Sequence, residues 1–337
     1  MTLVRAVLAA AVLLGSASAS GAAVLKVGPE EALKGPGMAA RVAKDGDTIE
    51  FAPGEYYGCG AFYQQRLTFT GPADPATPAV LTDMTCQGKA ILVIAGADVT
   101  VRHLTFARAR VGDGNGAGIR AEGRGLTVEH SRFVNNQSGI LSAPQPEATI
   151  AVRDSVFERN GVAGERCVAT LDIGETARLV VERSRFIGAR ACDVVRARGV
   201  ARTEVIDSRF EDGPGGEVRH LVLVEGGELL VRGSSFARGP QAEAAAVVLR
   251  DLSGNGSGVE MRESVLENGS GRKLVLLHAL TPKPAVVAGN KVGAWDTELD
   301  QSGYWTAWAR GSARAVIDTG KRAAGAAKRA VRSVLPF

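Results

Sequence analysis

The chain has 337 residues, of which 45% are hydrophobic, 5% are aromatic and 23% are charged, and its formal net charge is +4. The positive charge is concentrated near the C-terminus, where residues 310–337 contain seven basic residues and a single acidic residue, Asp318. The rest of the chain is slightly acidic, which argues against a basic surface for nucleic acid along its length.

Residues 1–19 have the pattern of a secretory signal peptide. Arg5 supplies a positive charge, residues 6–15 are apolar, and a small-residue Ala-Ser-Ala cleavage site ends at Ala19. The apolar segment is shorter than the ~20 residues that a membrane span needs. The sequence therefore predicts export to the periplasm or the extracellular space, with cleavage after Ala19 or, alternatively, after Ala23.

Residues 20–98 are expected to form an N-terminal cap and the first coils of a repetitive structure. Residues 29–43 have a helical pattern interrupted by Gly35-Pro36-Gly37, and residues 48–51 alternate like a strand before Pro53-Gly54 ends it. A cap helix over the open end would protect the unpaired edge of the first strand.

A short phrase recurs through residues 99–293. At residues 126–133 it reads Leu-Thr-Val-Glu-His-Ser-Arg-Phe. Its copies return at steps of 24 to 30 residues, and their last residues are Phe106, Phe133, Phe157, Phe186, Phe210, Phe236 and Leu266. A strand-like phrase with that period predicts one coil of a β-solenoid per repeat, because such a unit buries its apolar face only against its neighbours. We expect an all-β solenoid of roughly 9–10 coils.

The repeat also predicts which side chains stack between coils. The third position is Val and the eighth is Phe in six of the seven copies, so both should form inward apolar columns, with aromatic stacking in the second. The sixth position is Ser in six copies: Ser131, Ser155, Ser184, Ser208, Ser234 and Ser264. The strand pattern breaks there, so we interpret these hydroxyls as partners of bend backbone groups and not as nucleophiles.

Two histidines share one slot in consecutive copies. His103 and His130 stand three residues before the final Phe of each phrase, and the column continues with Asp154. Such a ladder could bind a metal or transfer protons. The adjacent outward column alternates in charge, reading Arg102, Glu129, Arg153 and Glu182. That alternation favours a solvated ion-pair ladder, and we predict no metal site.

Four cysteines in an exported chain predict two disulfides. Cys59 and Cys86 are 27 residues apart, and Cys167 and Cys192 are 25 apart, so each pair is separated by about one coil. Neighbouring strands lie about 4.8 Å apart, within the reach of a disulfide. The chain has no Cys-x-x-Cys and no Cys/His cluster, which disfavours metal or redox chemistry. We predict the pairs Cys59–Cys86 and Cys167–Cys192.

Residues 294–337 are expected to form a C-terminal cap and a basic amphipathic tail. A cluster of aromatic residues should seal the end of the coil: Trp295, Tyr304, Trp305 and Trp308. Residues 312–334 have an apolar face, mostly Ala, opposite a basic face. A capping helix or a frayed tail is the simplest interpretation, and contact with an anionic membrane surface or glycan is the alternative. The small Ala face buries little area, which disfavours membrane binding.

The chain resembles the right-handed parallel β-helix proteins of the pectin-lyase-like superfamily over roughly residues 24–293. The entry phrase Asp-Gly-Asp-Thr-Ile-Glu-Phe-Ala-Pro-Gly-Glu-Tyr at residues 45–56, and strands that begin with Gly118-Ile119 and Gly139-Ile140, are similar to that family's pattern. The resemblance implies the fold but no particular activity, because the superfamily contains lyases, hydrolases, epimerases and non-catalytic surface proteins. The sequence lacks the catalytic signatures of polygalacturonases, pectate lyases and alginate epimerases.

In the enzymes of that superfamily, the short strand after the variable loop forms the substrate groove. Its polar residues here include Asp172 and Asp193, to which no role is assigned. The candidate catalytic residues are Arg219, His220, Arg250 and Asp251, and the candidate substrate-binding residues are Arg120, Arg196, Lys273 and His278. A lyase needs a cation near the uronate carboxylate and a base for the α-proton. Arg219 with His220, or Arg250 with Asp251, could supply both.

Two functional hypotheses follow. The first is an exported, monomeric β-helix protein that binds or processes polysaccharide, with acidic polysaccharides among the candidates, without a cofactor. The second is a non-catalytic envelope or surface scaffold that is attached through its basic tail. The first predicts that acid, base and cation gather on one groove, and the second predicts charges scattered over all faces.

Overall fold

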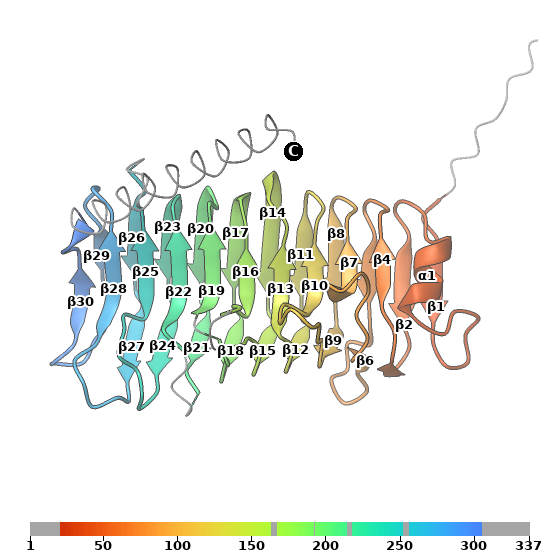
Figure 1. Ribbon diagram of the computed structural model, residues 1–337, viewed down its shortest axis with the longest axis horizontal. Helices are drawn as coiled ribbons and strands as arrows, with labels where there is room; N and C mark the ends of the chain where they lie inside the picture. The colour runs from red at the N-terminus through yellow and green to blue at the C-terminus, as the bar shows by residue number, and fades with distance from the viewer. Residues whose placement is uncertain (1–20, 163–166, 192, 214–217, 252–255, 305–337) are drawn as a thin grey trace, which may run out of the picture.

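The protein is a parallel β-solenoid. A computed structural model describes residues 21–162, 167–191, 193–213, 218–251 and 256–304. Figure 1 shows an elongated stack of coils, with the single named helix at the N-terminal end. Three parallel sheets run along the stack, and each regular coil passes through sheet C, then sheet A, then sheet B. The predicted all-β parallel β-helix is confirmed.

Sheet A contains the first half of each repeated phrase. Its 11 strands are, in order, β1 (Val24–Val27), β2 (Thr48–Phe51), β5 (Thr68–Thr70), β8 (Val99–Arg102), β11 (Leu126–Glu129), β14 (Gln145–Arg153), β17 (Thr176–Glu182), β20 (Arg202–Ile206), β23 (Glu228–Arg232), β26 (Val259–Arg262) and β29 (Val286–Ala288).

Sheet B contains the end of each phrase. Its nine strands are β3 (Gly54–Tyr56), β6 (Ala79–Thr82), β9 (Leu104–Ala107), β12 (Arg132–Val134), β15 (Val156–Glu158), β18 (Arg185–Ile187), β21 (Arg209–Glu211), β24 (Ser235–Arg238) and β27 (Val265–Asn268).

Sheet C contains the strands that follow the variable loops. Its ten strands are β4 (Gly60–Phe62), β7 (Ala90–Ile94), β10 (Ala117–Ala121), β13 (Ser138–Ser142), β16 (Leu171–Ile173), β19 (Asp193–Arg198), β22 (His220–Glu225), β25 (Val247–Arg250), β28 (Val275–Leu280) and β30 (Thr297–Asp300).

The interior is filled by the predicted apolar columns. Phe133 pairs in register with Phe106 and Phe157, and the ladder continues through the next coils to Phe236. Successive rings are stacked with centroids 4.6 to 5.2 Å apart. The side chains of this column are at most 1% exposed. Because the coil pitch matches the ring separation, one aromatic residue per repeat forms a continuous rib.

Ladders of polar side chains form hydrogen bonds with backbone groups at the corners of the coil. The backbone N–H of Ser131 donates to Ser155 Oγ at 3.2 Å, and Ser131 Oγ donates to the Glu129 carbonyl at 2.8 Å. The same pattern repeats along the column, which supports the structural interpretation of the serines. A second ladder was not predicted: Asn136 Nδ2 donates to Asn160 Oδ1 at 2.9 Å, and both residues are buried.

The cap helix α1 (Pro36–Val42) begins later than the sequence pattern suggested. Gly35-Pro36-Gly37 was expected to interrupt a helix, but Pro36 starts it. The fixed φ of proline suits the first helical turn, and its missing N–H has no helical partner there in any case. The preceding residues form a turn in which Gly28 N–H donates to the Leu33 carbonyl.

The predicted aromatic seal at the C-terminal end is wrong for Trp295, whose surface is 86% exposed. This residue lies in the turn closed by the Asp296 N–H and the Gly293 carbonyl, just before β30. The last strand β30 pairs with β28 and so extends the sheet without the indole. Tyr304 is buried, while Trp305, Trp308 and the basic tail lie outside the described residues.

One predicted disulfide is confirmed. Cys59 and Cys86 are joined, with their Cα atoms 5.4 Å apart. Cys167 is also disulfide-bonded, but its expected partner Cys192 lies outside the described residues, so that pairing stays a prediction. The expected signal peptide, residues 1–19, also lies outside them. In the part of the chain that the structure describes, no helix has the length and apolar character of a membrane span.

Candidate functional site

The outer face of sheet C carries the candidate site. Leu171, Val195 and Val222 pair in register across β16, β19 and β22 and point into the core. The residue after each of them, which is Asp172, Arg196 and Leu223 in turn, points outward. Parallel pairing thus aligns side chains from separate coils into outward rows.

Apolar residues cover this face on both sides of its centre. On the N-terminal side, Ala90, Val93, Ala117 and Leu141 form a cluster separate from the main core. On the C-terminal side, Leu223, Ala245 and Val248 form another. The charged residues of β16, β19 and β22 therefore lie between two apolar patches, where lower hydration strengthens electrostatic interactions.

A buried histidine–aspartate pair lies at the centre of the face. Asp193 and His220 are register partners at the starts of β19 and β22, and His220 Nδ1 lies 2.8 Å from Asp193 Oδ1. Asp193 is 4% exposed and His220 is 8% exposed. A carboxylate only accepts hydrogen bonds, so the imidazole donates from Nδ1, and Nε2 is the nitrogen left to take up a proton from another molecule. This is the arrangement of an oriented general base.

Arginines and a second carboxylate complete the cluster. Arg196 forms an ion pair with Asp172 and lies 3.9 Å from the carboxylate of Asp193, while Arg198 contacts Asp172 at 2.8 Å. Burial disfavours the charge on Arg196, but the hydrogen bond and charge of Asp172, with the charge of Asp193, outweigh it and raise the pKa of Arg196. The cluster, defined as Asp172, Asp193, Arg196, Arg198 and His220, therefore holds two guanidinium groups and two carboxylates beside the imidazole.

The four predicted catalytic residues do not all meet. His220 is in the cluster, and Arg219 is exposed immediately before β22. Arg250 forms an ion pair with Glu225 at 3.3 Å at the ends of β25 and β22. Asp251 is 1% exposed and accepts a hydrogen bond from the Ser257 N–H at 2.7 Å, so its carboxylate is buried against the chain just before β26. We therefore propose no catalytic role for Arg250 or Asp251.

The predicted substrate-binding residues are spread along the face. Arg196 is in the cluster, whereas Arg120 and His278 each lie three strands from Arg196, on opposite sides. That is about 14 Å at the usual strand spacing. Arg120 contacts Glu122 at 3.3 Å, His278 lies 3.7 Å from the Asp300 carboxylate, and Lys273 is exposed.

Asp172 and Asp193 were the residues that sequence reasoning left without a role. The signal that could have found the pair is the coil pitch, because Asp193 stands 27 residues before His220, or one coil. Loop lengths vary between coils, so the pitch alone does not fix the register. The observed pairing of β19 with β22 supplies it.

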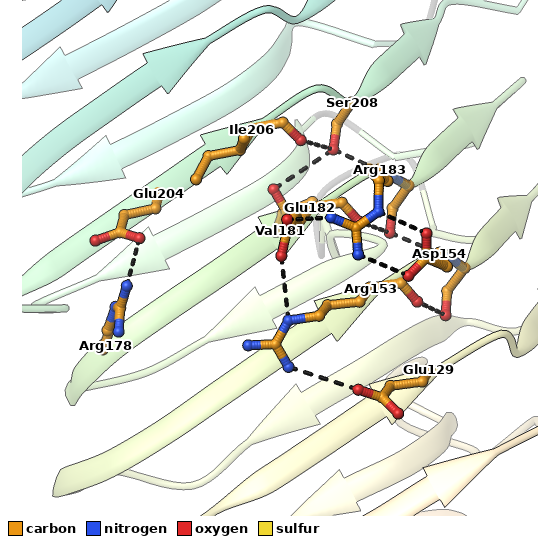
Figure 2. A network of polar contacts seen from close by, with 12 residues as sticks. Glu129, Arg153, Asp154, Arg178, Val181, Glu182, Arg183, Glu204, Ile206 and Ser208 are labelled. Carbon is orange, nitrogen blue, oxygen red and sulfur yellow. Dashed lines mark hydrogen bonds and ion pairs between the residues drawn. The ribbon is translucent and has the colours of Figure 1, made fainter.

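A second polar network covers sheet A and the corner beside it (Figure 2). Arg153 lies 3.7 Å from the Glu129 carboxylate and 3.2 Å from that of Glu182, while Arg183 forms a two-pronged contact with Asp154. Each charge thus has a partner in an adjacent coil. This confirms the predicted ion-pair ladder from Glu129 to Glu182.

The predicted histidine stack is also confirmed, beside this network. The rings of His103 and His130 are 5.1 Å apart and 5° from parallel. Parallel rings do not aim their nitrogens at a common point, as metal coordination requires. Within the described residues, no group of three or more His, Cys, Asp or Glu could hold a metal ion. Partial burial lowers the pKa of His103, and the charges of His130 and Arg102 lower it further.

Comparison with solved structures identifies the same architecture. An alginate lyase from Paenibacillus sp. str. FPU-7 matches with a TM-score of 0.52 and 13% identity over 83% of this chain and 98% of its own. A pectin methylesterase from Aspergillus niger matches with a TM-score of 0.51 and 11% identity over 86% and 96%. No family model and no curated protein sequence matches the chain. At these identities the likeness concerns the fold alone, which is a parallel β-helix.

Proposed function

We propose that the protein is an exported enzyme that processes an acidic polysaccharide on the outer face of sheet C, with His220 as its general base. The observation that carries the proposal is the buried hydrogen bond between His220 Nδ1 and Asp193. A buried histidine whose ring is oriented by a carboxylate is a candidate general base, and this pair therefore supports a catalytic role.

The cluster suits removal of a proton next to a carboxylate. In the proposed step, His220 Nε2 takes the proton from the sugar carbon adjacent to the uronate carboxyl group. Negative charge then develops on that carboxyl group, and the guanidinium of Arg196 or Arg198 stabilises it. Asp193 stabilises the imidazolium that forms. Electrons of the broken C–H bond form the double bond to the neighbouring ring carbon as the bond from that carbon to the glycosidic oxygen breaks. The departing oxygen takes a proton from the imidazolium or from water, so the reaction is an elimination.

The acidic substrate is supported by two exposed cations, one in the cluster and one next to it. The side chain of Arg198 is 51% exposed, and Arg219 is exposed at the entry to β22. Two proteins that share the fold are an alginate lyase and a pectin methylesterase, and alginate and pectin are both acidic polysaccharides. The Cys59–Cys86 disulfide supports an oxidising compartment, in keeping with export.

The test is product analysis after incubation of the protein with acidic and neutral polysaccharides. Mass spectrometry should detect oligosaccharides with unsaturated ends from at least one acidic polysaccharide. His220→Gln should lower kcat/KM by about 10²–10⁴-fold, the usual contribution of a general base. His278→Gln is the matched control on the same sheet face and should retain turnover. Saturated products only, or full activity in His220→Gln, would overturn the proposed mechanism.

The exposed arginine gives a second test of the same site. The double variant Arg219→Ala/His220→Ala should abolish turnover, because the base is lost along with a nearby cation. Arg219→Ala alone should raise KM for acidic substrates and leave kcat nearly unchanged, because Arg219 lies outside the cluster. Unchanged turnover in the double variant would remove this site. If no polysaccharide gives a product, the protein is better explained as a binding or scaffold protein.

A further inference from the structure

A buried ion pair lies in the corner between sheets B and C, close to His220. Asp212 follows β21, and Arg238 ends β24 in the next coil. Arg238 Nε lies 3.5 Å from Asp212 Oδ2, and the two side chains are 0% and 1% exposed respectively.

The regular corner is rebuilt to place this pair inside. In four earlier coils, the residue two positions after the stacked Phe is Arg108, Asn135, Arg159 or Gly188, and each has a positive φ of 53° to 58°. The side chains of Arg108, Asn135 and Arg159 are exposed or half-buried. Asp212 and Arg238 hold the same position after Phe210 and Phe236, but neither has a positive φ. Their side chains are buried instead.

Arg238 holds the backbone that leads into the candidate site. Its guanidinium donates to the Val218 carbonyl at 3.1 Å and to the Arg219 carbonyl at 3.3 Å. His220 is the next residue along the chain and begins β22. Asp212 in turn accepts a hydrogen bond from the Gly239 N–H at 3.4 Å and keeps the guanidinium in place.

The pair is an expensive way to stabilise a fold. Burial raises the pKa of Asp212 and lowers the pKa of Arg238, because both charges have lost their hydration. Asp212 Oδ1 and Arg238 Nε also have no hydrogen-bond partner. A buried ion pair of this kind is weak evidence for stability, whereas apolar residues of similar volume often serve as well. The location of this pair beside a buried histidine suggests that it positions the neighbouring backbone.

We propose that Asp212 and Arg238 are positioning residues that fix the chain at Val218 and Arg219, so that His220 Nδ1 meets Asp193. That this positioning serves catalysis rests on the proposed function. The positioning itself does not, because the position of the imidazole can be measured without substrate. A merely structural role would change the unfolding temperature but would leave the His220–Asp193 hydrogen bond intact in the folded protein.

The test is NMR of histidine-labelled protein, which has only four histidines. His220→Gln assigns the Nδ1–H signal of His220. In Arg238→Met and in Asp212→Asn, this proton should exchange with water about tenfold faster, the factor expected for loss of one hydrogen bond. The signals of His278 should not move. Arg185→Met is the matched control, because it removes the ion pair between Arg185, whose side chain is 55% exposed, and Glu211, and should leave His220 unchanged.

A second variant covers the case in which one uncompensated buried charge prevents folding. Asp212→Ala/Arg238→Met removes both charges and should fold, while the Nδ1–H of His220 still exchanges about tenfold faster than in the wild type. An unchanged exchange rate of this proton in any folded variant of the pair would overturn the proposal. If exchange is faster but the wild-type protein turns over no polysaccharide, the positioning role stands and the proposed function fails.

Discussion

At the scale of single residues, the same side chain has a different character in each environment. His103 and His130 stack at a corner, His220 is buried against Asp193, and His278 faces Asp300. Only His220 combines burial with an oriented, hydrogen-bonded ring. Its chemistry therefore depends on a neighbour one coil away and not on the residues beside it in the sequence.

The histidine stack predicts a pH dependence of stability. The pKa of His103 is lowered in the folded protein, mainly by burial. A base with a lowered folded pKa contributes stability above its unfolded pKa of about 6.5, and loses it as the pH falls through the folded value. The urea concentration at the unfolding midpoint should therefore decrease when the pH is lowered from about 7.5 to about 5, and His103→Gln should make that decrease smaller. An equal decrease in the variant would contradict the prediction.

At the scale of the element, two kinds of column run along the coil with very different energetic weight. The inner column stacks phenylalanine rings with no access to water, and the outer column on sheet A alternates Arg and Glu. Burying an apolar side chain stabilises the fold more than a partly solvated ion pair does. Water screens the attraction between the two charges, whereas the apolar side chain gains free energy by leaving water. The inner column should therefore set the stability of each coil.

The two columns can be compared within one coil. Phe157→Ala should lower the free energy of unfolding by about 3–5 kcal/mol, because it leaves a cavity between two stacked rings. Arg153→Met removes contacts to Glu129 and Glu182, whose side chains are a quarter to a third exposed, and should cost less than about 1 kcal/mol. Denaturant titration measures both, and similar losses would contradict this ranking.

At the scale of the whole molecule, the coils form a one-dimensional stack. Each strand pairs with the strands of the coils before and after it, so stability is passed on between nearest neighbours. The disulfide of Cys59 and Cys86 joins two neighbouring coils near the capped N-terminal end. The candidate site lies in the middle of the stack, where coils on both sides hold β19 and β22 in register.

Removing this disulfide should destabilise the N-terminal coils selectively. The bond closes a loop of 27 residues, for which the chain-entropy estimate is about 3.5 kcal/mol. In Cys59→Ala/Cys86→Ala, amide hydrogen exchange should become faster in β4 and β7 and stay nearly unchanged in β22 and β25. A uniform increase along the chain would show that the stack unfolds as one unit.

The sequence by itself determined the solenoid, because a phrase of period 24 to 30 residues with inward Val and Phe admits few other ways to bury its apolar face. It also determined the serine bends, the histidine stack and the Cys59–Cys86 pair, since all of these follow from stacking coils in phase. The start of α1 and the exposure of Trp295 depend on local turns that the repeat does not describe.

Only the tertiary structure decided the candidate site. Arg250 and Asp251 looked as suitable in the sequence as Arg219 and His220, and Asp193 had no assigned role. Strand register brings Asp193 to His220, whereas the carboxylate of Asp251 is buried and accepts a hydrogen bond from the Ser257 N–H. The physical reason is that loop lengths differ between coils, so which residues meet on the outer face is set by hydrogen-bonded pairing across sheet C and not by distance along the chain.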